Sequence, residues 1–402
     1  MERSRPARFS TALWWGASLA GLSVLGWVFW QAGETRSPNL KSPKNEPALE
    51  ARPPARKGVP LNIPAPPPAT APIPITSNPP PPTAAATTNG PPPALGMTNL
   101  PPVTPQEPPP ETAEGLPRPV QNLLEAQIAL ARQGISSGSI DGVLGSQTRA
   151  ALRVYQQQQK ITPTGTLDVA TKTRLSLSAP PTTNYTITQE DLDRLMVVPK
   201  TWLGKSEQKR LDYETILELV AEKAHAHPNL IRRLNPGLAW TNTVPAGTSV
   251  VIPAADYPPG KGKANYARIH LAAKTLEVFD TEDRLLAHFP CSIARQVEKR
   301  PVGQLQVVTV VTNPNYVFKP EIFPESAEAR EIGRKLVLHP GPNNPVGVAW
   351  IGLNRPGYGI HGTPKPEEVG RTESHGCFRL ANWNAEYLAQ LVSIGTPVFI
   401  DP

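Results

Sequence analysis

The chain has 402 residues, with 40 Lys and Arg against 33 Asp and Glu, and a formal net charge of +7. This length allows two or three domains of about 150 residues each. The positive charge suits an anionic partner such as a membrane surface or a cell wall, but the basic residues are scattered, which argues against nucleic acid. Two cysteines exclude a disulfide scaffold and a four-cysteine zinc site.

Residues 1–32 predict a membrane anchor or a signal sequence. An arginine-containing start precedes an uncharged stretch from Phe9 to Ala32, which is long enough to span a bilayer because a helix needs about 20 apolar residues. Tryptophans lie toward both ends of the stretch, as in an aromatic belt. A cleaved signal peptide is the alternative, although no small-x-small cleavage site is evident. Both interpretations place the rest of the chain in the periplasm or cell envelope.

Residues 33–119 predict a disordered, proline-rich linker. Of the 51 prolines in the chain, 24 lie between Pro53 and Pro119. Runs such as PPPP at 79–82 exclude helices and central strands and favour extended polyproline II. At about 3.1 Å per residue, the linker can separate a folded domain from a membrane by as much as about 260 Å.

Residues 120–177 predict a small α-helical bundle. Apolar residues recur at helical spacing in VQNLLEAQIALARQG, and Gly134 ends that helix. Ser146 is expected to cap a second helix, QTRAALRVYQQQQ, and residues 167–175 predict a third, shorter one.

The string GSIDGVLGSQTRAALRVYQQ at 138–157 resembles the peptidoglycan-binding domain of wall hydrolases and transpeptidases. That pattern is Asp-Gly, a glycine three residues on, then Thr, Ala-Leu and an aromatic residue followed by Gln. The matching positions are Asp141, Gly142, Gly145, Thr148, Ala151, Leu152, Tyr155 and Gln156. The resemblance implies peptidoglycan as a partner, although most of these residues form turns and core.

Residues 185–254 predict a small α+β module. Two short helices are expected in YETILELVAEKAHAHPNLIRRLNPGL, and VPAGTSVVIP at 244–253 predicts a strand that follows a turn. The second helix and this strand resemble a LysM glycan-binding module, with an untypical insertion after the weak first strand. A structural spacer is the alternative. His225 and His227 are expected to lie on the surface of a helix rather than to bind a metal.

Residues 266–402 predict a mainly-β domain closed by one late helix. Short alternating or apolar runs separated by turn residues are typical of strands, and NWNAEYLAQLVSIG predicts the helix. The multi-domain chain therefore combines a membrane helix, a linker, a helical bundle, an α+β module and this C-terminal domain.

The segment HGTPKPEEVGRTESHGCFRL at 361–380 gathers reactive side chains in a loop. His361 and Cys377 are 16 residues apart, across an excursion that can fold back. Gly376 allows a tight turn whose amides can face a developing oxyanion. A buried, inert thiol is the alternative, but its polar neighbours do not form cores. A zinc site from His361, His375 and Cys377 has only three local ligands and fits no common zinc motif.

The strings IHGT at 360–363 and SHGCFRL at 374–380 resemble the signature of the L,D-transpeptidase (YkuD-type) family, over residues 266–402. The resemblance implies a YkuD-like β-sandwich. It also implies that Cys377 is the nucleophile, that His361 is the base and that the carbonyl of Gly362 orients the imidazole.

The same resemblance implies roles for the neighbouring residues. His375 and the amides of Gly376 and Cys377 are expected to line the oxyanion pocket, whereas Ser374 and Arg379 are expected to bind the substrate. The chain departs from the family pattern in two places, where Val302 replaces a proline and Asn384 replaces an aspartate. These departures concern substrate geometry rather than the nucleophile.

The implied reaction is acyl transfer between peptidoglycan stems. A cysteine thioester forms with the third residue of a tetrapeptide stem, D-alanine leaves, and an amine of a neighbouring stem completes a 3→3 cross-link. No metal or organic cofactor is implied, and carbapenems are expected inhibitors. Water, a free amino acid or a protein amine is the alternative acceptor, and a wall-binding protein without catalysis is the alternative from another class.

Overall fold

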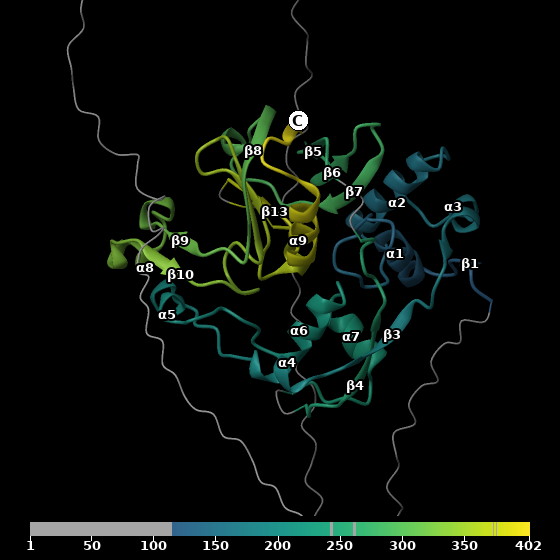
Figure 1. Cartoon of the computed structure of the whole chain (residues 1–402), viewed down its shortest axis with the longest axis horizontal. Coiled ribbons are helices and arrows are strands. Elements are labelled where there is room, and N and C mark those ends of the chain that lie inside the picture. The colour runs from purple at the N-terminus through teal and green to yellow at the C-terminus, as the bar shows by residue number, and fades with distance from the viewer. Residues whose placement is uncertain (1–114, 242–243, 260–262, 373, 375) are drawn as a thin grey trace, which may run out of the picture. The chain divides into compact units, whose positions relative to one another are not determined.

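The computed structural model describes residues 115–241, 244–259, 263–372, 374 and 376–402. The predicted membrane segment and nearly all of the predicted linker lie outside the described residues. Among the helices of the described part, none is both long and apolar enough to cross a bilayer. The described chain is shown in Figure 1.

The helical domain contains three helices and a short two-stranded sheet: α1 (Leu123–Ala131), α2 (Ser146–Gln158), α3 (Val169–Arg174), β1 (Arg118–Pro119) and β2 (Ser176–Leu177). The side chain of Asn122 caps α1, and that of Asp168 caps α3. The prediction that Ser146 caps α2 is wrong. Gly145 occupies that position, so α2 begins at Ser146 without a side-chain cap.

The helical domain contacts the last strand of the C-terminal sheet, β7 (Leu285–Pro290). The amide of Ser136 donates to the carbonyl of His288 at 2.8 Å, and the amide of His288 donates to the carbonyl of Gly134 at 3.0 Å. Gly134 has a φ of +80° and lies so close to β7 that a side chain there would strike the carbonyl of Leu286.

The middle module pairs its first and last strands in an antiparallel sheet with helices between them. Its elements are β3 (Thr182–Thr186), α4 (Gln189–Asp193), α5 (Trp202–Ser206), α6 (Ile216–Lys223), α7 (Pro228–Leu234) and β4 (Ser249–Pro253). The apolar faces of α6 and α7 are buried, as their periodicity predicts. The segment before α6, which carries α5, is the insertion noted in the sequence.

The histidines of the middle module are not a surface pair on one helix, so that prediction is wrong. His225 follows α6 and stacks on Trp383 of the C-terminal domain, with 5.4 Å between ring centroids. Its pKa falls to about 4 because burial disfavours the imidazolium. His227 caps α7 by accepting from the amide of Asn229 at 3.1 Å.

The C-terminal domain is built on one eight-stranded sheet in the order β13-β12-β11-β8-β14-β5-β6-β7. The pairs β14–β5 and β12–β13 are parallel and the others antiparallel. Besides β7, the strands are β5 (Tyr266–His270), β6 (Thr275–Phe279), β8 (Gly303–Thr312), β11 (Ala349–Leu353), β12 (Gly359–His361), β13 (Phe378–Arg379) and β14 (Pro397–Asp401).

The predicted sandwich of two sheets is therefore a single curled sheet. The first half of β8 pairs with β14, and its second half pairs with β11, so one strand of 10 residues joins the two halves. Helix α9 (Asn382–Leu391) packs against β8, β11 and β12 (Figure 1). The helix buries Leu388 and Leu391 in the same apolar core as the sheet.

A hairpin with its own small core lies between β8 and β11 in the chain, outside the main sheet. It consists of β9 (Tyr316–Phe318) and β10 (Leu336–Leu338), with α8 (Ala327–Ile332) between them. The middle module completes this core, since Trp202 stacks on Phe318 with 4.5 Å between ring centroids. Short 3-10 turns lie at Val297–Lys299, Pro320–Ile322 and Pro366–Glu368.

Candidate active site

The excursion between His361 and Cys377 folds back so that its two ends become neighbours. Strands β12 and β13 are parallel, with Ile360 opposite Phe378 and His361 opposite Arg379. Cys377 immediately precedes β13, and the amide of Leu380 donates to the carbonyl of His361 at 2.8 Å. The sheet thus brings the predicted nucleophile and base to adjacent strand ends.

His361 is buried and held in one orientation. Its Nδ1 donates to the carbonyl oxygen of Gly362 at 2.6 Å, and its ring stacks on Trp350 of β11 with 5.6 Å between centroids. Burial, with a smaller effect of the Arg379 charge, lowers the pKa of His361 to about 4. The imidazole is therefore neutral near pH 7. Because Nδ1 carries the proton, Nε2 keeps a lone pair that can accept one.

Cys377 is partly buried and protonated in the resting state. Its thiol donates to the carbonyl of Gly357 at 3.4 Å. Burial raises the pKa of this thiol, although the Gly359 amide and the Arg379 charge oppose the shift. Among the hydrogen bonds of the described residues, none joins the thiol to His361. A thiol beside a neutral imidazole favours general-base activation during attack over a preformed thiolate–imidazolium pair.

The turn before Cys377 is shaped by Ser374. The Ser374 hydroxyl donates to the carbonyl of Cys377 at 2.5 Å and accepts from the amide of Gly376 at 3.2 Å. The predicted oxyanion donor Gly376 is thus engaged with Ser374 in this state. Arg379 donates from Nη2 to Thr372 Oγ1 at 3.1 Å. His375, the remaining predicted site residue, lies outside the described residues.

Sequence reasoning missed two aromatic residues at this site. Tyr316 lies in β9. Burial and, to a smaller extent, the nearby charge of Cys377 together raise the pKa of Tyr316 to about 12. Trp350 packs on the base as described above. Both residues lie in strands. The alternation of apolar and polar residues in a strand predicts which side chains are buried, but it does not predict which loop a side chain faces.

The second cysteine is a packed thiol. Cys291 has no exposed surface, is free, and has a pKa raised to about 12 by burial.

Asn384, one of the two departures from the family pattern, is buried and has a hydrogen-bond partner. Its side chain accepts from the hydroxyl of Tyr257. This amide serves as an acceptor without bringing a charge into the core.

Comparisons with known proteins found matches to two parts of the chain. A family model described as the L,D-transpeptidase catalytic domain (YkuD) matches residues 264–400, and one described as "Putative peptidoglycan binding domain" matches residues 120–175. The chain is 28% identical to "Putative L,D-transpeptidase YkuD" of Bacillus licheniformis over 187 residues, which are 46% of this chain and 93% of that protein.

Two further matches are shorter. "Putative L,D-transpeptidase YqjB" of Bacillus subtilis is 35% identical over 106 residues, which are 25% of this chain and 51% of that protein. The solved structure of an L,D-transpeptidase from Mycobacterium smegmatis is 19% identical, with a TM-score of 0.27, over 39% of this chain and 64% of that one. Residues 185–254 stay LysM-like by prediction only. Residues 264–400 thus match the L,D-transpeptidase catalytic domain (YkuD), and residues 120–175 match a peptidoglycan-binding domain.

Proposed function

We propose that this protein is a cysteine L,D-transpeptidase that forms 3→3 cross-links in peptidoglycan. One observation carries the proposal. The His361 ring is neutral, is held by the carbonyl of Gly362, and lies on the strand next to Cys377 in the matched catalytic domain. This arrangement suits acyl transfer through a thioester, because a neutral base can take the thiol proton as the sulfur attacks.

The first half-reaction would acylate the enzyme. As Nε2 of His361 takes the thiol proton, Sγ of Cys377 bonds to the carbonyl carbon of the third stem residue. The oxyanion would accept from the amides of Gly376 and Cys377 once Gly376 turns from Ser374. The bond to the terminal D-alanine then breaks, and the imidazolium returns its proton to the leaving amine, which leaves a thioester.

The second half-reaction would transfer the acyl group. An amine on the side chain of a neighbouring stem attacks the thioester and gives a proton to His361. The carbon–sulfur bond breaks as the amide forms, and the thiol regains the proton. Transfer to water would instead give a shortened tripeptide stem, and transfer to a free amino acid or a protein amine would give the corresponding amide.

The reaction is tested by incubating the purified protein with disaccharide-tetrapeptide and weighing the products. We expect release of D-alanine and a dimer linked between two third-position residues. A tripeptide without a dimer would change the acceptor to water and contradict the cross-linking proposal. Unchanged substrate, from protein that binds wall material, would favour the non-catalytic alternative.

We also propose that residues 120–177 hold the enzyme on peptidoglycan and that residues 9–32 tether it to the cytoplasmic membrane. The matched peptidoglycan-binding domain supports the first proposal, and the uncharged N-terminal stretch supports the second. Cell fractionation is expected to recover the full-length chain with membranes. Recovery in the cytosol would contradict both the tether and an exported signal sequence.

A further inference from the structure

Glu222 lies in the middle module, yet its carboxylate binds the catalytic domain. Both carboxylate oxygens accept from Nδ2 of Asn382, at 3.2 and 3.0 Å. The hydroxyl of Tyr213 donates to the same carboxylate at 3.2 Å. Asn382 is the first residue of α9, and only about 1% of its surface is exposed. This partly buried carboxylate has no part in the reaction described above.

The other end of Asn382 faces the loop of the catalytic base. Its Oδ1 accepts from the amide of Val348 at 3.4 Å. A Cβ added to either Gly347 or Gly362 would collide with this oxygen, so the amide fills the space beside both glycines. Because the carbonyl of Gly362 holds Nδ1 of His361, the side chain of Asn382 supports the group that orients the base.

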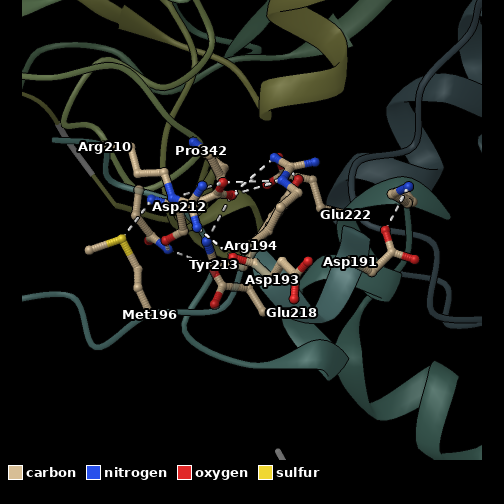
Figure 2. Close-up of polar contacts among 12 residues, drawn as sticks. Asp191, Asp193, Arg194, Met196, Arg210, Asp212, Tyr213, Glu218, Glu222 and Pro342 are labelled. Atoms are coloured by element: carbon tan, nitrogen blue, oxygen red, sulfur yellow. Dashed lines mark hydrogen bonds and ion pairs between the residues drawn. The ribbon is translucent and has the colours of Figure 1, made fainter. Parts of the chain in front are cut away.

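Charged groups surround Glu222 on the side of the middle module. Figure 2 shows it among Arg194, Tyr213 and Glu218, with Arg194 directed to Asp212. Arg194 and Asp212 form an ion pair at 3.0 Å. Burial raises the pKa of Glu222 to about 7, against the lowering effects of Asn382, Tyr213 and Arg194, while Glu218 raises it further.

A neighbouring carboxylate on the same helix offers a matched control. Glu218 also has a raised pKa, because it too is partly buried. Its Oε1 accepts from Nδ2 of Asn343 at 2.7 Å, so it binds the same catalytic domain, and among the hydrogen bonds of the described residues none joins it to Asn382. A substitution at Glu218 therefore removes a partly buried acid from this contact, whereas a substitution at Glu222 also removes the support for the base.

We propose that Glu222 is a positioning residue for His361, which it holds through Asn382 and the carbonyl of Gly362. The proposal rests on the proposed function, because it assumes that His361 is the base. It makes the middle module a structural part of the active site, whether or not that module binds glycan. The rate of the cysteine chemistry should then depend on a side chain outside the catalytic domain.

The test is the rate at which a carbapenem acylates the full chain, followed by intact mass. At pH 8 we expect Glu222→Ala to slow acylation about tenfold, because misplacing a catalytic group by a fraction of an ångström carries a cost of this order. Glu222→Gln, which keeps the shape but loses a charged acceptor, should slow it about fivefold. Glu218→Gln should acylate at the wild-type rate.

The pH dependence distinguishes positioning from general destabilisation. Protonated Glu222 resembles glutamine, so the ratio of wild-type to Glu222→Gln rates should approach one near pH 5.5 and grow as the pH rises through about 7.

Each outcome bears on one proposal. A rate ratio that does not change with pH, or equal slowing by Glu218→Gln, would overturn the role of Glu222 and leave the proposed function standing. If the folded wild-type chain is never acylated at Cys377, the proposed function itself fails.

Discussion

Replacing Cys377 with alanine is expected to abolish thioester formation and lower cross-linking by on the order of 10⁴-fold or more. The thiol is the only group of the protein that bonds to the acyl carbon in the proposed mechanism. Cys377→Ser should be nearly as inactive, because a neutral imidazole is a weak base for a hydroxyl. A carbapenem, whose β-lactam opens when Sγ attacks its carbonyl, should add its mass once to the wild type and not to either variant.

Cys291→Ser is the control for this experiment. Cys291 is fully buried, with a thiol pKa of about 12, so this variant should keep most of its activity and take the label. All three cysteine variants should retain the wild-type circular dichroism spectrum. Label on Cys291, or 3→3 cross-links made by Cys377→Ala, would contradict the assignment of the active site.

The pH dependence of the same labelling reports how the thiol is activated. Acylation needs neutral His361, whose pKa is about 4, so the rate should be lost as the pH drops through that value, well below the smaller, about fivefold decline that protonation of Glu222 is expected to cause near pH 7. Iodoacetamide needs a thiolate, and burial raises the pKa of Cys377 above its ordinary 9.0, so alkylation should still increase beyond pH 9. Alkylation that is already constant near pH 6 would instead indicate a resting thiolate.

Replacing Gly362 with alanine is expected to slow acylation about 100-fold, because the base would lose its orientation. The new Cβ would collide with Oδ1 of Asn382 and press on Gly347. Either the side-chain amide of Asn382 or the carbonyl of residue 362, which holds His361, must then move. Overpacking of this kind also costs about 1–3 kcal/mol in the free energy of unfolding. Stopped-flow acylation and chemical denaturation measure the two effects.

Gly237→Ala is the matched control, since a Cβ at Gly237 meets no atom within 4 Å and needs no positive φ. It should change neither the acylation rate nor the stability appreciably. If Gly362→Ala acylates at the wild-type rate, the carbonyl of Gly362 does not orient the base, and the path from Asn382 to His361 would have no functional consequence.

Local patterns predicted the elements of this fold well. Alternation in 266–280 predicts β5 and β6, and the apolar spacing in α6 places Ile216, Leu217 and Val220 in the core. The curled sheet was not predicted because alternation does not show which strands pair. The two halves of the sheet are joined by β8, which is long enough to pair with a different neighbour along each of its own halves.

The candidate site was predicted only as far as its motif extends. Cys377 and His361 are recognisable because a reactive residue beside glycine has a local signature. The link from Glu222 to Asn382 spans 160 positions, and neither residue is unusual within its own helix. Trp202 and Phe318 likewise meet only in the folded chain. Such pairs depend on how the modules dock, which no periodicity encodes.

The contact between the helical domain and β7 has a consequence for how this architecture can vary. A terminal strand presents unpaired amides and carbonyls that can recruit another chain and cause aggregation. Here both backbone groups of His288 bind residues 134–136 of the helical domain. That domain therefore covers part of this edge, and exchanging it for another module would leave the strand exposed unless the newcomer supplied an equivalent backbone segment.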